Sequence, residues 1–425
     1  IKPMYHLLRK SMPTISKTEQ EALEAGTTWW EKELFSGKPD WHQFSAIALP
    51  RLSEREQQFL DNEVVELCQL IDEWEVHQRQ DLSPEVWDYL RQHGFFGLII
   101  PEEFGGLDFS PYAQSRIMSK IASCSPTAAV TAMVPNSLGP GELLVKYGTE
   151  EQKQRWLPQL VSGERISALA MTEPGQGSDL QSVETHAVLE DGVFRVNGAK
   201  TFITNGQTAN LICLVVKTQR DAGARGISLL MIETDQVDGF RRGQNLDKIG
   251  LKGQDTSELF FDDMLVPEGN ILGLEPGQGF YQLMNQLPWE RLAIGIGALG
   301  HMDFALTETL EYVKERKAFG KSIFEFQNTR FKLAEQKTKL EVTRAFINQC
   351  IELQRDGQLD ATTASMAKWW SSQMQCEVID ECLQLFGGYG YMLEYPIARA
   401  YADARVQKIY GGTNEIMKEL IARSL

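Results

Sequence analysis

The chain has 425 residues, of which 42% are hydrophobic and 24% charged, and its formal net charge is −16. A chain of this length is too long for one compact core, so we expect two or three cooperating domains. The hydrophobic and charged fractions are typical of globular proteins. The excess of acidic residues argues against the clustered basic face that nucleic-acid binding requires, so we expect no nucleic-acid partner.

The six cysteines form no CxxC pair and have no metal-ligand spacing with the six histidines. We therefore expect reduced thiols, no metal site and an intracellular protein, in the cytoplasm of a bacterium or in the mitochondrial matrix of a eukaryote. No apolar run reaches the roughly eighteen residues of a membrane span. The numbering starts without Met, so a leader or membrane segment upstream stays open.

Residues 1–45 are polar, contain three tryptophans and predict an accessory arm with a helix over 16–35. Over residues 46–165, apolar side chains recur at intervals of three and four and predict a helical domain.

Residues 166–275 change to short apolar runs and predict an antiparallel, barrel-like β domain. The expected strands are 193–196, 211–217, 227–232 and 258–261, with turns at 191–192, 197–198 and 205–206. Gly175 and Gly177 have no third glycine at position 180, so a Rossmann fingerprint fails.

Residues 276–425 return to helical spacing, including one long helix over 326–353 that ends at Asp356 and Gly357. The predicted fold class is therefore a multi-domain α+β protein with the element order helical, β, helical.

The most informative segment is 171–179, which combines one proline, two glycines and short polar side chains at the entry to the β domain. Such a loop can aim several backbone N–H groups one way, which suits a ring or a pyrophosphate, although a simple Gly-Pro turn is an equally good interpretation of this loop alone. Together with the glycine-rich segment 384–391 it indicates a buried flat cofactor.

Five segments in order, 168–179, 200–206, 315–320, 384–388 and 410–416, resemble motifs of the acyl-CoA dehydrogenase family over roughly residues 50 to 425. The C-terminal half is most similar to the long-chain branch, and the N-terminal part to long bacterial fatty acyl-CoA dehydrogenases. The resemblance implies a C-terminal four-helix bundle and bound FAD. It also implies conversion of medium- or long-chain acyl-CoA to trans-2-enoyl-CoA in fatty acid β-oxidation, an electron-transfer flavoprotein as acceptor, and a homo-oligomer, tetramer or dimer.

By the same resemblance, Thr172 and Ser178 hydrogen-bond the isoalloxazine, and residues 202–204 lay an aromatic face and a hydroxyl beside it. Arg316, Phe319 and Gln327 are expected to reach the pyrophosphate and adenosine across a subunit boundary; without the family pattern, Arg316 would be a solvated helix-end charge. The full expected FAD-binding set is Leu169, Met171, Thr172, Gly177, Ser178, Phe202, Ile203, Thr204, Arg316, Phe319, Gln327, Gln384, Leu385, Gly387, Gly388, Thr413, Asn414 and Glu415.

The family reaction requires a carboxylate that removes the α-proton while the β-hydride leaves to flavin N5. Family members place this base either late in the chain, where this sequence has Gly411, or early in the C-terminal domain, where it has Glu290. We therefore expect Glu290 to be the base, with a pKa raised by desolvation, and Glu415 to be the next candidate. The alternative is a solvated Glu290 paired with Arg291 or Lys314.

The resemblance also implies that the Gly411 N–H stabilises the enolate-like oxygen of the thioester and that Arg291 and Tyr281 line the route of the CoA arm. The expected substrate-binding residues are Ser178, Tyr281, Arg291, Gly411 and Gly412.

Two groups of helix-breaking residues leave alternatives open. Gly295, Gly297 and Gly300 predict a close approach, either of substrate or of another helix, and residues 138–141 predict either a deepened acyl pocket or a plain turn.

Two other functions are compatible with the same fold. One is a flavin oxidase, and the other is a catalytically silent relative kept as an assembly or interaction partner, which would require loss of the base or of the cofactor contacts.

Overall fold

The structure is a computed structural model that describes residues 51–425, so the expected arm at 1–45 lies outside the described residues. The N-terminal part is helical, as expected. Three of its helices begin with Ser at the N-cap followed by Pro at the first helical position, a pair that satisfies a free N–H and presets the backbone angle. Its helices are α5 (Glu54–Asp61), α6 (Glu63–Leu70), α7 (Glu73–Arg79), α8 (Pro84–Gln92), α9 (Pro111–Ala122), α10 (Pro126–Asn136), α11 (Pro140–Tyr147) and α12 (Glu150–Val161).

The middle part is one seven-stranded sheet with the order β1-β4-β2-β3-β7-β6, and β5 pairs with β4. Most pairs are antiparallel, but β1 and β2 both run parallel to β4. Both faces of β4 are buried: alternate residues contact the inner sheet core and the helices α11 and α12. The strands are β1 (Ser167–Ala170), β2 (His186–Glu190), β3 (Val193–Thr204), β4 (Leu211–Lys217), β5 (Ile227–Glu233), β6 (Phe240–Asn245) and β7 (Thr256–Pro267).

The turn expected at 197–198 is wrong, because β3 continues through it. Gly198 lies at a register shift of the β3–β7 pair, and a Cβ there would lie 2.4 Å from Thr185 Oγ1. The glycine therefore serves a close approach within a bulged strand.

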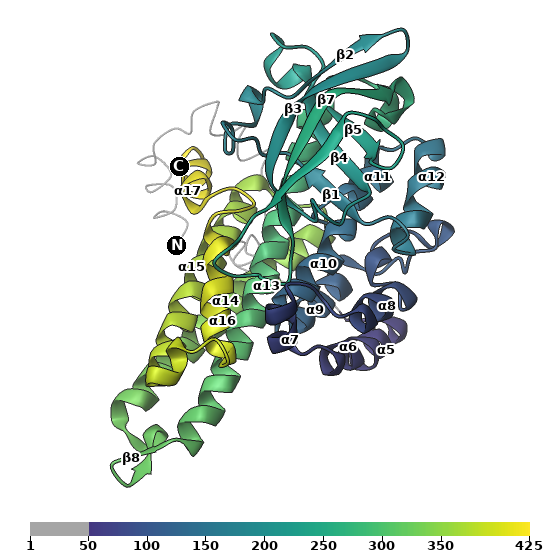
Figure 1. Ribbon diagram of the computed structural model, residues 1–425. Coiled ribbons are helices and arrows are strands. Elements are labelled where there is room, and N and C mark those ends of the chain that lie inside the picture. The colour runs from purple at the N-terminus through teal and green to yellow at the C-terminus, as the bar shows by residue number, and fades with distance from the viewer. Residues whose placement is uncertain (1–50) are drawn as a thin grey trace, which may run out of the picture. The chain divides into compact units, whose positions relative to one another are not determined.

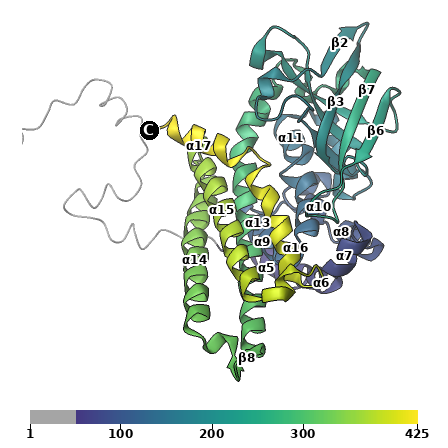
Figure 2. The ribbon, with the colours of Figure 1, turned by 60° about the vertical axis from the view of Figure 1, so that its left-hand side comes forward.

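The C-terminal part is a bundle of long helices that run side by side (Figures 1 and 2). The helix α13 has 37 residues and so is roughly 55 Å long at 1.5 Å per residue. The bundle ends, away from the sheet, in the short hairpin of β8 (Lys317–Ala318) and β9 (Lys321–Ser322) (Figure 1). Its helices are α13 (Gly279–Glu315), α14 (Gln327–Arg355), α15 (Ala361–Leu385), α16 (Pro396–Ala404) and α17 (Asn414–Ala422).

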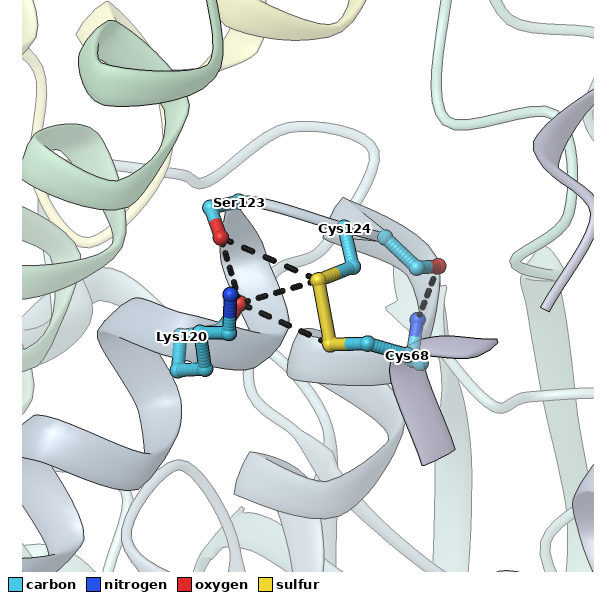
Figure 3. Close-up of a disulfide and its surroundings, with 6 residues drawn as sticks. Cys68, Lys120, Ser123 and Cys124 are labelled. Atoms are coloured by element: carbon cyan, nitrogen blue, oxygen red, sulfur yellow. Dashed lines mark hydrogen bonds between the residues drawn. A yellow bond between two sulfur atoms is a disulfide. The ribbon is translucent and has the colours of Figure 1, made fainter. Parts of the chain in front are cut away.

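The expectation of six reduced thiols is wrong for one pair. Cys68 in α6 and Cys124, two residues after α9, form a disulfide with a Cα–Cα distance of 5.6 Å. Figure 3 shows the bond beside Lys120 and Ser123. The two cysteines are 56 positions apart, so only the packing of α6 on α9 brings them together.

None of the helices within residues 51–425 combines the length and the apolar character needed to cross a bilayer.

Candidate active site

Glu290 lies in the first half of α13 and is only 8% exposed. Its Oε1 atom is buried and has no hydrogen-bond partner among the described residues. Burial, followed by the nearby charge of Glu142, raises the pKa of this carboxyl to about 8, although Arg291 and Lys146 oppose the shift. A buried carboxylate with a free oxygen and a pKa near neutrality has the properties of a general base.

A hydrogen-bonded charge pair lies beside this carboxylate. Gln286, one turn before Glu290 on α13, donates to Glu142 of α11, and Lys146 pairs with the same Glu142 at 2.6 Å. Lys146 Nζ also donates to Gln286 Oε1 at 3.0 Å. Sequence analysis missed this cluster because Glu142 and Gln286 are 144 positions apart. The one available signal was the four-residue spacing of Gln286 and Glu290.

The loop that holds Gly411 and Gly412 precedes α17 and approaches α13 at Ile294, one turn beyond Glu290. Both have left-handed φ angles, +63° and +88°, and a Cβ at position 411 would lie 2.3 Å from Ile294 Cδ1. A glutamate at 411 would therefore be strained by the positive φ, and the end of the Ile294 side chain would have to shift to make room for it.

The remaining expected substrate contacts differ in placement. Arg291 is buried between α13 and α15, where its guanidinium donates to Ser365 Oγ at 3.3 Å. Tyr281 is exposed near the start of α13, and Ser178 is exposed in the 171–179 loop. Only Arg291 is thus held inside the protein next to Glu290.

The first group of expected cofactor residues surrounds the 171–179 loop. Thr201 N donates to Thr172 O at 2.9 Å, and this bond joins the loop to β3. Phe202 has a φ of +59° in a β-bulge and exposes 67% of its surface, whereas Ile203 is buried in the sheet core. A bulky residue at positive φ is uncommon, and here it turns an aromatic ring outward.

An ion pair that sequence analysis missed fixes this loop. Lys200 of β3 is fully buried, and its Nζ donates to Glu173 Oε1 at 2.8 Å and to the Met171 carbonyl at 2.9 Å. Glu173 also accepts N–H bonds from Glu184 and Thr185. Burial alone would raise the pKa of Glu173, but Lys200 and these N–H groups outweigh it, so that the pKa is lowered.

A second group of expected cofactor residues lies at the far end of the bundle. Arg316, Leu385, Gly387 and Gly388 line one cavity of about 520 Å³ with Tyr389. Phe319, Gln327 and Gln384 are exposed. Arg316 follows Glu290 by 26 residues, which is roughly 39 Å of helix. The 171–179 loop lies at the entry to the sheet, whereas Arg316 directly precedes the β8–β9 hairpin at the end of the bundle away from the sheet (Figure 1). One chain therefore does not bring these two groups of cofactor residues together.

The third group is the segment 413–415 at the start of α17. Thr413 caps this helix through Oγ1, and Glu415 is exposed. Asn414 is buried, and its Oδ1 accepts hydrogen bonds from α15, so its side chain is engaged inside the protein.

A narrow cavity begins one turn beyond Glu290. Its free volume is about 30 Å³, and it follows one face of α13 past Ile294, Gly297 and His301. A Cβ at Gly297 would meet nothing within 4 Å, so this glycine borders open space. The other lining residues are Ala122, Pro126, Ala129, Val130, Met133, Leu138, Leu251, Ala293, Asp403, Gln407 and Tyr410.

The other glycines have packing roles. A Cβ at Gly295 would lie 2.7 Å from Ile347 Cδ1, and one at Gly300 would lie 2.1 Å from the Ser119 carbonyl oxygen of α9. At Gly139 and Gly141 a Cβ would collide with carbonyl oxygens at 2.2 and 1.8 Å. The 138–141 segment is thus a tight connection that leads from α10 into the first turn of α11, although Leu138 lines the cavity.

Comparison with known proteins gives the family. Three family descriptions match: "Acyl-CoA dehydrogenase, N-terminal domain" over residues 51–164, "middle domain" over 168–264 and "C-terminal domain" over 277–425. The chain belongs to the acyl-CoA dehydrogenase family, whose members are oxidoreductases and flavoproteins and are typically homotetramers.

The similar proteins agree with this assignment. The long-chain specific acyl-CoA dehydrogenase of Sus scrofa mitochondria is 46% identical over 355 residues, which cover 83% of this chain and 81% of that protein. The crystal structure of an acyl-CoA dehydrogenase from Geobacillus kaustophilus has a TM-score of 0.84 at 41% identity and covers 89% of this chain and 99% of its own. A structure of the electron transferring flavoprotein of Acidaminococcus fermentans matches at a TM-score of 0.83 and 33% identity, over 88% and 98% of the two chains.

The residues present fit FAD. A Cβ at Gly175, Gly177, Gly387 or Gly388 would meet nothing within 4 Å, so backbone at both ends is open to a close ligand. Phe202 offers an exposed aromatic face, and Arg316 offers a guanidinium that suits a pyrophosphate.

Proposed function

We propose that this chain is an FAD-dependent acyl-CoA dehydrogenase of medium- or long-chain substrates, with Glu290 as the base. The observation that carries the proposal is the buried, unpartnered Glu290 carboxylate of α13, one turn before Ile294, which the loop of Gly411 and Gly412 approaches. The glycine at the late position, held at a positive φ that strains any side chain, supports the early position of the base.

The protein's own groups divide the work. Glu290 removes the α-proton of the thioester, and its desolvated surroundings strengthen it as a base. The Gly411 N–H is proposed to donate to the thioester oxygen, where negative charge develops. The narrow cavity past Gly297 marks the proposed route of the acyl chain, and it must widen from about 30 Å³ to admit that chain. FAD, when bound, supplies the hydride acceptor for the β-carbon.

We further propose that the 171–179 loop and Phe202 hold the flavin ring, while the Arg316 cavity holds the pyrophosphate and adenosine of a second copy's FAD. The roughly 39 Å of helix between Glu290 and Arg316 supports this division between two chains. An electron-transfer flavoprotein is the proposed electron acceptor.

The proposed activity is tested by anaerobic reduction of a ferricenium dye with palmitoyl-, octanoyl- and isovaleryl-CoA. Dye reduction with the straight-chain substrates and no peroxide in air is the expected result. Peroxide formation in air would identify an oxidase instead. Absence of any turnover would identify a catalytically silent relative.

The Glu142–Lys146 pair beside Glu290 predicts that two substitutions shift the pH dependence of kcat/KM in opposite directions. The charged groups acting on the pKa of Glu290 are Glu142, Lys146 and Arg291. A base with a raised pKa is active only once deprotonated, so kcat/KM rises with pH through about 8. Glu142→Gln removes a negative charge, lowers this pKa and moves the rise to lower pH.

Lys146→Met removes a positive charge and moves the same rise to higher pH. Glu150→Gln, in the exposed Glu150–Lys153 pair of α12, is the matched control and leaves the profile unchanged. Shifts of the same sign in the first two variants contradict the prediction. The measurement is kcat/KM for octanoyl-CoA from pH 6 to 9, a range of roughly three units around the raised pKa.

The open space at Gly297 gives a prediction about chain length. Gly297→Leu fills the cavity one turn beyond Ile294, so kcat/KM for palmitoyl-CoA falls roughly tenfold or more while that for octanoyl-CoA changes little. Gly297→Ala is the control, because a Cβ meets no atom within 4 Å. Equal losses on both substrates would place the acyl chain elsewhere.

A further inference from the structure

One buried cation, which is close enough to Arg291 to feel its charge, has no assigned role. Lys368 of α15 is fully buried, and its Nζ donates to the Gly412 carbonyl oxygen at 2.7 Å and to Asn414 Oδ1 at 3.1 Å. Ser372 Oγ donates to the same Oδ1 at 3.0 Å. Both acceptors of Lys368 are neutral, and it forms no ion pair with a carboxylate within residues 51–425.

This arrangement is energetically unusual. A buried ammonium ordinarily has a carboxylate partner, because neutral acceptors replace its hydration only partly. Desolvation, with the positive charge of Arg291, lowers the pKa of Lys368 to about 8. The group is thus still largely charged at neutral pH, and its hydrogen bonds are of the strong, charge-assisted kind.

The bond to Gly412 holds a segment that has few other restraints. Before it, Tyr410 N donates to Val406 O, and after it Thr413 caps α17. Among the described residues, Lys368 makes the only hydrogen bond to Gly411 or Gly412, and the N–H groups of both glycines have no acceptor there. Two consecutive left-handed glycines without side chains would otherwise be free to change conformation.

We propose that Lys368 is a positioning residue of the active site, which fixes the Gly412 carbonyl and thereby keeps the Gly411 N–H aimed at the thioester oxygen. The inference rests on the proposed function. The N–H bond to the substrate strengthens as charge develops on that oxygen, so loss of its aim slows proton removal more than it weakens substrate binding.

The test is Lys368→Met, which keeps most of the side-chain volume and removes the donors. The expected result is a kcat lower by roughly tenfold or more per bound flavin, with KM changed less than about threefold. The exchange of the α-protons of palmitoyl-CoA in D₂O, measured by mass spectrometry without an electron acceptor, falls by a similar factor. Flavin content and melting temperature report the folded state.

Ser372→Ala is the matched control, because it removes the other donor to Asn414 and leaves the bond to Gly412 intact. Its kcat is expected within about twofold of wild type. If Lys368→Met does not fold, Lys368→Gln replaces it, since this uncharged side chain is one bond shorter and cannot reach both acceptors. An unchanged kcat and exchange rate in the folded Lys368 variant, or an equal loss in Ser372→Ala, overturns the proposal. If the wild-type protein does not reduce the dye, the proposed function itself is contradicted instead.

Discussion

Glu290→Gln is expected to abolish nearly all turnover while the protein keeps its fold and its yellow colour. The substitution preserves the size of the side chain but removes the group that accepts the α-proton, and Gly411 leaves no second carboxylate at the late position. We expect kcat/KM for palmitoyl-CoA to fall on the order of 10³-fold or more. The assay is dye reduction per bound flavin, with FAD content from absorbance.

The matched control is Glu311→Gln, an exposed glutamate on the same helix, which should keep activity within about twofold. Residual activity of Glu290→Gln above roughly a tenth of wild type would mean that another group removes the proton, and Glu415 would be the first to test.

Lys200→Met is expected to cause the largest loss of stability among single substitutions near the site. Glu173 is buried, and without Lys200 its carboxylate keeps only the two N–H bonds from the backbone. Removing one member of a buried ion pair lowers the free energy of unfolding by about 3–5 kcal/mol, because the other charge stays desolvated. The Met171 carbonyl also loses its partner, so FAD retention should fall as well.

The measurement is a urea titration of the flavin-loaded protein, followed by flavin and tryptophan fluorescence. The double variant Lys200→Met with Glu173→Gln removes both charges and should recover much of the lost stability. A double variant as unstable as Lys200→Met alone would show that the packing of Lys200, not its charge, matters.

The elements with a strong local signal were predictable from sequence. The expected strand at 211–217 coincides with β4, and the expected helix at 326–353 corresponds to α14. Both are long runs in which hydrophobic pattern and propensity agree. The fold class of the family is confirmed as a whole. The short strands β1, β2 and β6 were missed, because pairing partners rather than local sequence define them.

The parts of the site that depend on distant neighbours were not predictable. Gly295, Gly297 and Gly300 look alike in sequence, and only the neighbouring helices distinguish them. Gly295 packs against Ile347 and Gly300 against Ser119, whereas Gly297 borders open space. The same holds for Lys368, whose acceptors lie 44 and 46 positions away. The sequence identified Glu290 as a candidate base, but it could not show that Glu142 and Lys146 lie close enough to change its pKa.

The Cys68–Cys124 bond has a consequence for handling the protein. It closes a loop of 56 positions, and in the chain-entropy account such a cross-link destabilises the denatured ensemble by roughly 4 kcal/mol. The bond fastens α6 to the end of α9, whose Ser119 carbonyl touches α13 at Gly300. A thiol reductant in the purification buffer would therefore loosen the support behind the helix that carries the base.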